Sequence, residues 1–163
     1  MSTRPPIVFR VFFASLAVFA AAMLPACAST SAPRFEFAGA SVTEHTAEGV
    51  AVSITVDAYN DNDIALPLRD IDYVVEIDGR TVFRGTRSAE ATLRRRGVQQ
   101  IRLPAVVVLA PGERGPTGEA DIRLVGRVTY ITPGKLAEIL FDSGVRVPSA
   151  PVAVAGRVDL GAP

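Results

Sequence analysis

Few side chains in this 163-residue chain could support catalysis or bind a metal. His45 is the single histidine and Cys27 the single cysteine. A Ser–His–Asp site would need His45, yet no G-x-S-x-G nucleophile motif accompanies it. His45 lies in a polar segment, where we expect a solvent-exposed side chain. Centres built from several His and Cys ligands are excluded by count. The sequence therefore predicts no catalytic residues, no enzyme activity and no cofactor.

Carboxylates are concentrated in residues 57–72, at Asp57, Asp61, Asp63, Asp70 and Asp72. Calcium binds oxygen ligands in flexible loops, so Asp61 and Asp63 with nearby carbonyls are the candidate ligands. The EF-hand pattern fails because Ala65 and Leu66 stand where a third oxygen ligand and the glycine are needed. We therefore predict solvated turn carboxylates and no metal, and keep calcium or small-ligand binding as a further alternative.

An export signal precedes the cysteine. Arg4 and Arg10 lie in the first ten residues, the apolar run Val11–Leu24 follows, and Leu24-Pro25-Ala26-Cys27 closes the segment. This order is typical of a secretory signal with a cleavage site, and the run is short for a membrane-spanning helix. The last four residues resemble a bacterial lipobox. We expect residues 1–26 to be a lipoprotein signal peptide and Cys27 to be lipidated; ordinary cleavage nearby and an uncleaved anchor are the alternatives.

The same resemblance implies a location. Ala28 and Ser29 follow the cysteine without an aspartate, which in a two-membrane bacterium implies sorting to the outer membrane, facing the periplasm. Several acyl chains would hold the protein firmly at the membrane. Residues 27–34 are small and polar with one proline, so they predict a flexible tether.

The charge balance limits the partners. Loss of residues 1–26 removes two of the 17 basic residues and leaves a net charge of −2. A near-neutral surface lacks the basic face that nucleic acid requires. We expect a monomer that contacts the membrane through lipidated Cys27, with other envelope proteins as candidate partners.

Alternation of apolar and polar residues with period two dominates residues 35–163 and predicts β-strands. The expected strands are Phe35–Val42, Val50–Tyr59, Ile71–Ile77, Arg80–Arg84, Val98–Leu109, Ile122–Tyr130 and one or two within Val145–Leu160. Asp78-Gly79 predicts a hairpin turn, and Pro133–Phe141 a short helix. Pro67 cannot donate to a ladder, so Ile64–Leu68 is expected on an edge or outside the sheet. About seven strands with one helix indicate an all-β antiparallel sandwich, with a closed barrel as the alternative.

The stretch Val56–Gly85 resembles the water-stress-and-hypersensitive-response (WHy) domain of late-embryogenesis-abundant type 2 proteins. That domain has an Asn-Pro-Asn turn after a strand, an apolar-Pro-apolar segment, a strand with a tyrosine, and a hairpin bounded by glycines. The matching positions are Tyr59, Asn60, Asn62, Leu66, Pro67, Leu68, Tyr73, Gly79 and Gly85, with Asp61 in place of the middle proline. The resemblance implies a fibronectin-type-III or immunoglobulin-like sandwich over residues 35–163. It also implies a non-enzymatic role in desiccation and stress protection, in a family whose bacterial members are often exported lipoproteins.

A second function stays open beside stress protection. The chain could be an envelope interaction module that binds a protein partner by strand addition. Pro67 and Pro104 predict exposed sheet edges, and the Gly- and Pro-rich loop Pro111–Gly118 is a candidate contact surface.

Overall fold

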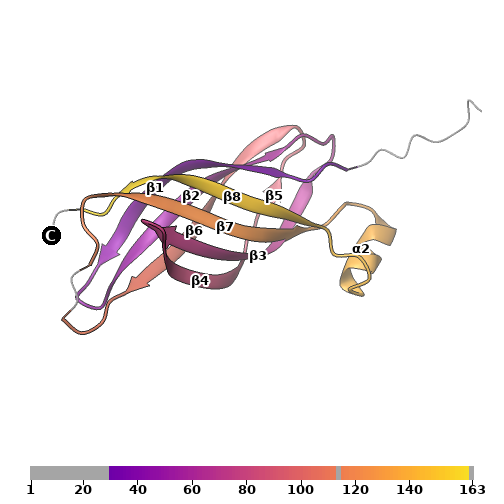
Figure 1. The fold of residues 1–163 in the computed structure, drawn as a ribbon. Coiled ribbons are helices and arrows are strands. Elements are labelled where there is room, and N and C mark those ends of the chain that lie inside the picture. The colour runs from indigo at the N-terminus through magenta and orange to yellow at the C-terminus, as the bar shows by residue number, and fades with distance from the viewer. Residues whose placement is uncertain (1–29, 113–114, 162–163) are drawn as a thin grey trace, which may run out of the picture.

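Two antiparallel sheets pack face to face in the computed structural model, which describes residues 30–112 and 115–161 (Figure 1). The described chain forms eight strands and one helix. In order these are β1 (Arg34–His45), β2 (Gly49–Asn60), β3 (Leu66–Ile77), β4 (Arg80–Ser88), β5 (Thr92–Leu93), β6 (Gly97–Val108), β7 (Glu119–Tyr130), α2 (Lys135–Asp142) and β8 (Ser149–Asp159).

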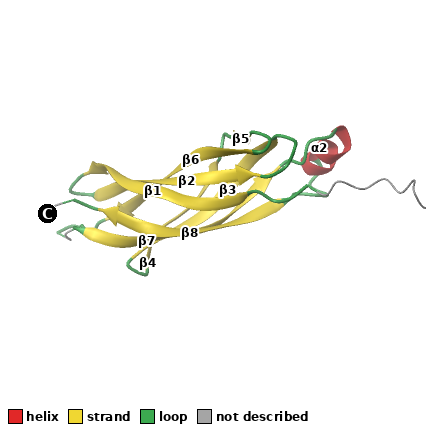
Figure 2. Cartoon of the chain, turned by 90° about the horizontal axis from the view of Figure 1, so that it is seen from above, coloured by secondary structure: helices red, strands yellow, loops and turns green. Residues whose placement is uncertain are grey.

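The two sheets have different sizes. One has the order β1-β2-β6, and the other has the order β4-β3-β7-β8 with β5 paired to the start of β3. Seen from above, β1 runs beside β8, although no ladder joins them (Figure 2). The predicted all-β sandwich with one short helix is therefore confirmed.

Alternation along each strand sends one set of side chains into the space between the sheets. In β2 the inward set is fully buried, because every second residue faces the opposite sheet: Val50, Val52, Ile54, Val56 and Ala58. β3 contributes Ile71, Tyr73, Val75 and Ile77 from the other side. Burial of one such aliphatic side chain stabilises a fold by about 1.5–3 kcal/mol. These positions are the ones that the period-two pattern predicts.

The Asp78-Gly79 turn joins β3 and β4 as predicted. Both residues have positive φ, 48° for Asp78 and 76° for Gly79, the combination that a two-residue hairpin of matching twist requires. The strand that follows continues to Ser88, four residues beyond the predicted end. Similarly, β1 continues to His45 and α2 ends at Asp142.

The prediction for Pro67 is wrong. Pro67 lies inside β3, opposite Thr92 of β5. On the other side of the strand, the backbone N–H of Ile131 donates to the Pro67 carbonyl at 2.9 Å. A proline is tolerated here because it is the second residue of its strand, where few ladder bonds are lost. The β5 strand was not predicted, since a two-residue strand has no period to recognise.

Candidate functional site

Asn60 is the one buried polar side chain in the described part of the molecule, with 1% of its surface exposed. It ends β2 and its amide nitrogen Nδ2 reaches three backbone carbonyls. The acceptors are the oxygens of Ile64 at 2.7 Å, Arg94 at 3.1 Å and Leu93 at 3.4 Å. The side chain therefore joins the β2–β3 turn to the β5–β6 turn, which lies more than thirty positions further along the sequence.

Asn62 continues this network outward. Its backbone N–H and its Nδ2 both donate to Oδ1 of Asn60, at 3.0 and 2.8 Å. Its side chain also makes a reciprocal pair with the backbone of Ser31, with Ser31 N–H donating to Oδ1 at 2.8 Å and Nδ2 donating to the Ser31 carbonyl at 2.9 Å. The Asn62 carbonyl accepts from the N–H of Arg96. The two asparagines thus hold together the segment before β1 and two turns.

The carboxylates of this turn are paired with arginines. Asp61 accepts a hydrogen bond from Nε of Arg34 at 3.0 Å, and the Arg34 guanidinium also lies 5.2 Å from the centre of the Tyr59 ring. Asp63 binds Nε and Nη2 of Arg96. The hydrogen bond from Arg96 holds the pKa of Asp63 below its ordinary value, so both members of this pair are charged at neutral pH.

The structure does not gather the acidic residues into a metal site. Asp57 lies in β2 and Asp72 in β3, on different sheets, and Asp72 accepts a hydrogen bond from the Thr86 hydroxyl. Within the described ranges, no group of three or more His, Cys, Asp or Glu side chains is close enough to hold a metal ion. Asp61 and Asp63 serve as arginine partners instead.

Tyr73 and Gly85, two of the WHy-like positions, are register partners on neighbouring strands. Tyr73 is also opposite Gly126 of β7, where an added Cβ would lie 2.9 Å from the Tyr73 Cβ. The Tyr73 ring therefore has small neighbours on both sides and contacts Phe83, with ring centres 5.3 Å apart. The remaining WHy-like positions Leu66 and Leu68 are buried core residues.

The Tyr73 hydroxyl crosses between the sheets. It donates to the backbone carbonyl of Pro104 in β6, while its ring is 3% exposed. Burial raises the pKa of Tyr73. Pro104 lies on an edge strand, and this bond occupies the carbonyl at the middle of that edge. Sequence reasoning missed the contact because it joins positions 31 residues apart.

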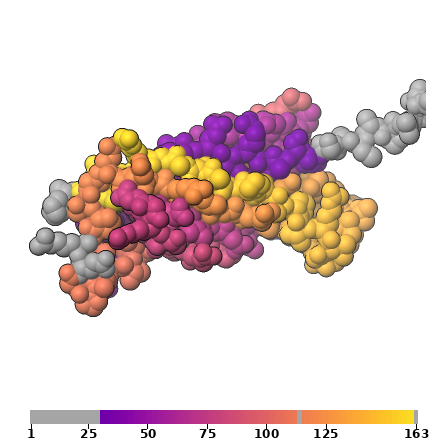
Figure 3. Space-filling view, in the orientation of Figure 1, coloured from indigo at the N-terminus to yellow at the C-terminus, as the bar shows by residue number. Residues whose placement is uncertain are grey.

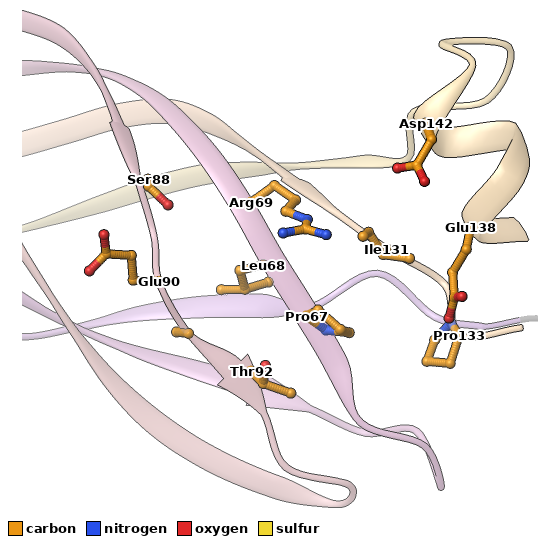
Figure 4. Close-up of a pocket in the computed structure, with 11 residues that line it drawn as sticks. Pro67, Leu68, Arg69, Ser88, Glu90, Thr92, Ile131, Pro133, Glu138 and Asp142 are labelled. Carbon is orange, nitrogen blue, oxygen red and sulfur yellow. The ribbon is translucent and has the colours of Figure 1, made fainter.

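A shallow pocket of about 470 Å³ lies between the start of β3 and the helix α2 (Figure 4). Arg69 projects into it, and the carboxylates of Glu138 and Asp142 approach from α2. Pro67 and Thr92 also line it. The lining mixes one guanidinium, several carboxylates and the hydroxyls of Ser88 and Thr92. It includes no histidine or cysteine, so the hydroxyls have no imidazole base within the pocket.

Two further predicted features lie apart from this region. His45 is the exposed last residue of β1, and it is separated by the length of β2 from the Asn60 turn. Cys27, the predicted lipidation site, lies outside the described residues. Among the described residues, no helix, α2 included, is long and apolar enough to cross a bilayer.

The two packed antiparallel sheets define a small β-sandwich protein. The model of the late embryogenesis abundant protein family LEA_2 matches residues 55–162, about two-thirds of the chain, so the chain belongs to this family. No curated protein matches the sequence.

Two solved structures share the fold. The solution structure of AT1g01470 from Arabidopsis thaliana has a TM-score of 0.62 and 15% identity, covering 86% of this chain and 89% of that one. The solution structure of At2g46140.1, described as a late embryogenesis abundant (LEA) protein, has a TM-score of 0.60 and 19% identity, covering 95% and 84%. At these identities the likeness concerns the fold alone.

Proposed function

We propose that this chain is a non-enzymatic, lipid-anchored protein of the bacterial envelope that protects neighbouring proteins or membranes during water loss. Membership of the late embryogenesis abundant type 2 family is the observation that carries the protective part of the proposal. The anchoring part rests on the export signal and on Cys27, and the WHy-like turn of Asn60 and Asn62 supports assignment to the WHy type.

The described residues suit a protein that acts through its surface. Between the sheets the described side chains are apolar, apart from Asn60 and the tyrosine hydroxyls such as that of Tyr73, so a ligand would bind outside the core. The outer face of β7 and β8 carries both signs of charge, including the pairs of Arg157 with Glu119 and Asp121 at 3.6 Å. Exposed pairs of this kind contribute little to stability, but they keep the surface strongly hydrated. Such a surface can separate other macromolecules as water is withdrawn.

Drying experiments test the protective role. The purified mature protein is mixed with an aggregation-prone enzyme, dried and rehydrated, and the residual enzyme activity is compared with that obtained with an inert protein at equal mass. We expect higher recovery with this protein. Equal recovery would exclude the protective function.

Fractionation tests the anchor separately. The wild-type chain should take up a labelled fatty acid and sediment with membranes, whereas a Cys27→Ala variant should incorporate no label. Label on neither protein would show that Cys27 is not a lipidation site, whatever the drying experiment gives.

Partner binding at the sheet edges is the second candidate. The edge strands β4 and β6 face one another across the sandwich, and a cleft of about 480 Å³ opens beside Val82, Val107 and Val108. Because Tyr73 already bonds to Pro104, an added strand would fit at this cleft and not at the middle of β6. Crosslinking through a Val108→Cys variant in membranes should then capture one stoichiometric partner protein. Capture of only abundant, nonspecific membrane proteins would refute partner binding at this edge.

A further inference from the structure

Exposed apolar side chains gather on α2 and the segment after it. α2 has no buried residue, and its Leu136 and Ile139 are 70% and 64% exposed. The segment toward β8 adds Val145 and Val147, at 74% and 47%. We name these four residues the α2 apolar patch. In Figure 3 this region projects beyond the end of the sandwich. Such a cluster of large exposed hydrophobic residues commonly marks an interaction surface.

The patch lies at the end of the molecule where the described chain begins. Arg34, the first residue of β1, pairs with Tyr59 near the end of β2, and β3 begins just beyond the turn that follows. Tyr130, the last residue of β7, pairs with Leu68 of β3, and α2 follows within five residues. Figure 1 shows the indigo start of β1 and the helix α2 at the same end.

The segment that joins Cys27 to this end of the sandwich is short. Ser31 is fixed to Asn62 by two hydrogen bonds, and Pro33 is buried. Only four residue steps separate Ser31 from Cys27. A fully extended chain spans at most ~3.6 Å per residue, so these steps reach at most about 14 Å. This distance is close to the diameter of one helix, about 10–12 Å. Lipid attached to Cys27 would therefore hold this end of the sandwich against the membrane.

We propose that the α2 apolar patch rests on the phospholipid surface to which the chain is anchored. The proposal rests on the lipidation of Cys27 given above, and it adds the orientation of the domain and the residues that contact lipid. Leu136, Ile139 and Leu140 have the spacing of one helix face, which suits an interfacial helix. The exposed Arg94 and Arg95 lie at the same end, beside Arg96, whose N–H bonds to Asn62 and whose guanidinium is paired with Asp63. Basic side chains there favour a surface with anionic headgroups.

A single-tryptophan reporter tests the contact, since the chain has no tryptophan of its own. The lipidated mature protein carrying Ile139→Trp is reconstituted on vesicles of phosphatidylethanolamine and phosphatidylglycerol with brominated acyl chains. Its matched control is Val108→Trp, because Val108 is 78% exposed and pairs with Gly49 at the opposite end of β2. We expect a blue-shifted, quenched emission for Ile139→Trp and an unshifted, unquenched emission for Val108→Trp.

Vesicle flotation separates lipid anchoring at Cys27 from lipid contact by the α2 apolar patch. If both variants float and neither is quenched, the anchor holds and the lipid contact of the patch is refuted. If neither floats, the anchor fails and the inference fails with it. A blue shift of Ile139→Trp that depends on protein concentration without vesicles would identify a second copy as the occupant, and would also refute the proposal. Replacement of Leu136 and Ile139 by serine should abolish the orientation measured by quenching at a Val147→Trp reporter while flotation persists.

Discussion

The substitution Asn60→Ala should destabilise the domain more than any other change in the β2–β3 turn. Alanine removes the Nδ2 donor to the carbonyls of Ile64, Arg94 and Leu93, as well as the Oδ1 acceptor for Asn62. A hydrogen bond contributes a net ~1 kcal/mol, and a buried group left without a partner costs about 1–3 kcal/mol. Loss of the bonds at 2.7 and 3.1 Å, at ~1 kcal/mol each, and of one buried partner, at about 1–3 kcal/mol, gives a total of about 3–5 kcal/mol.

Urea unfolding followed by circular dichroism measures this loss. Domains of this size have a total stability of about 5–15 kcal/mol, so the midpoint should fall clearly at an unchanged slope. The control is Asp61→Ala in the same turn, whose carboxylate is exposed and paired with Arg34. Surface changes of this kind usually stay within about 0.5 kcal/mol. Equal midpoints for the two variants would refute the structural role of Asn60.

Asn60→Asp separates donor from acceptor. The new carboxylate keeps an acceptor for Asn62 but faces the three carbonyls that Asn60 now bonds. Burial near these oxygens should raise its pKa, so this variant should be at least as unstable as Asn60→Ala at neutral pH. Its stability should recover as the pH falls through the raised pKa, since the protonated form can donate. An absence of recovery would show that hydrogen-bond donation by the side chain at position 60 is not the source of its stabilising effect.

Two further predictions concern contacts between the sheets. Tyr73→Phe removes the bond to Pro104 and should lower the free energy of unfolding by about 1–2 kcal/mol. Because burial raises the pKa of Tyr73 above 10.0, the neutral hydroxyl stabilises the fold below pH 10, and this stability is lost as the pH rises through the raised pKa. The Tyr73→Phe variant should lack this loss when unfolding is measured at alkaline pH. Gly156→Ala places a Cβ 2.1 Å from the Phe37 ring, and this overpacking should lower the free energy of unfolding in urea by about 1–3 kcal/mol. Gly39→Ala meets no atom within 4 Å and should be nearly neutral. A loss for Gly39→Ala equal to that for Gly156→Ala would contradict the packing argument.

The strands were largely predictable because their pattern is local. The period-two alternation in Val50–Tyr59 and Val98–Leu109 matches β2 and β6, each within a residue. Prediction failed where pairing with a distant segment of the same chain decides the structure. The β5 strand exists because Thr92 and Leu93 pair with the start of β3. Pro67 belongs to β3 because it lies opposite Thr92 in this pairing. Neither partner can be recognised from a window of neighbouring residues.

The candidate site shows the same division. The Asn-Asp-Asn turn was recognisable as a family motif, and asparagine is common in turns because its side chain bonds to nearby backbone. What Asn60 binds was not predictable, since two of its three acceptors are the last residue of β5 and the first residue of the turn that follows it. The acidic residues seemed a single cluster in the sequence, but the successive strands β2 and β3 carry Asp57 and Asp72 to different sheets.

By itself the sequence determined which segments form strands, which face of each strand is buried, and which turn residues define the family. These properties depend on side-chain periodicity and on backbone preferences within a few residues. The tertiary structure alone decided that Asn60 is the buried centre of two turns, that Tyr73 bridges to Pro104, and that α2 lies at the end where the described chain begins. Those contacts join residues more than thirty positions apart or depend on the order of strands in the sheets, so they arise only when the two sheets pack together.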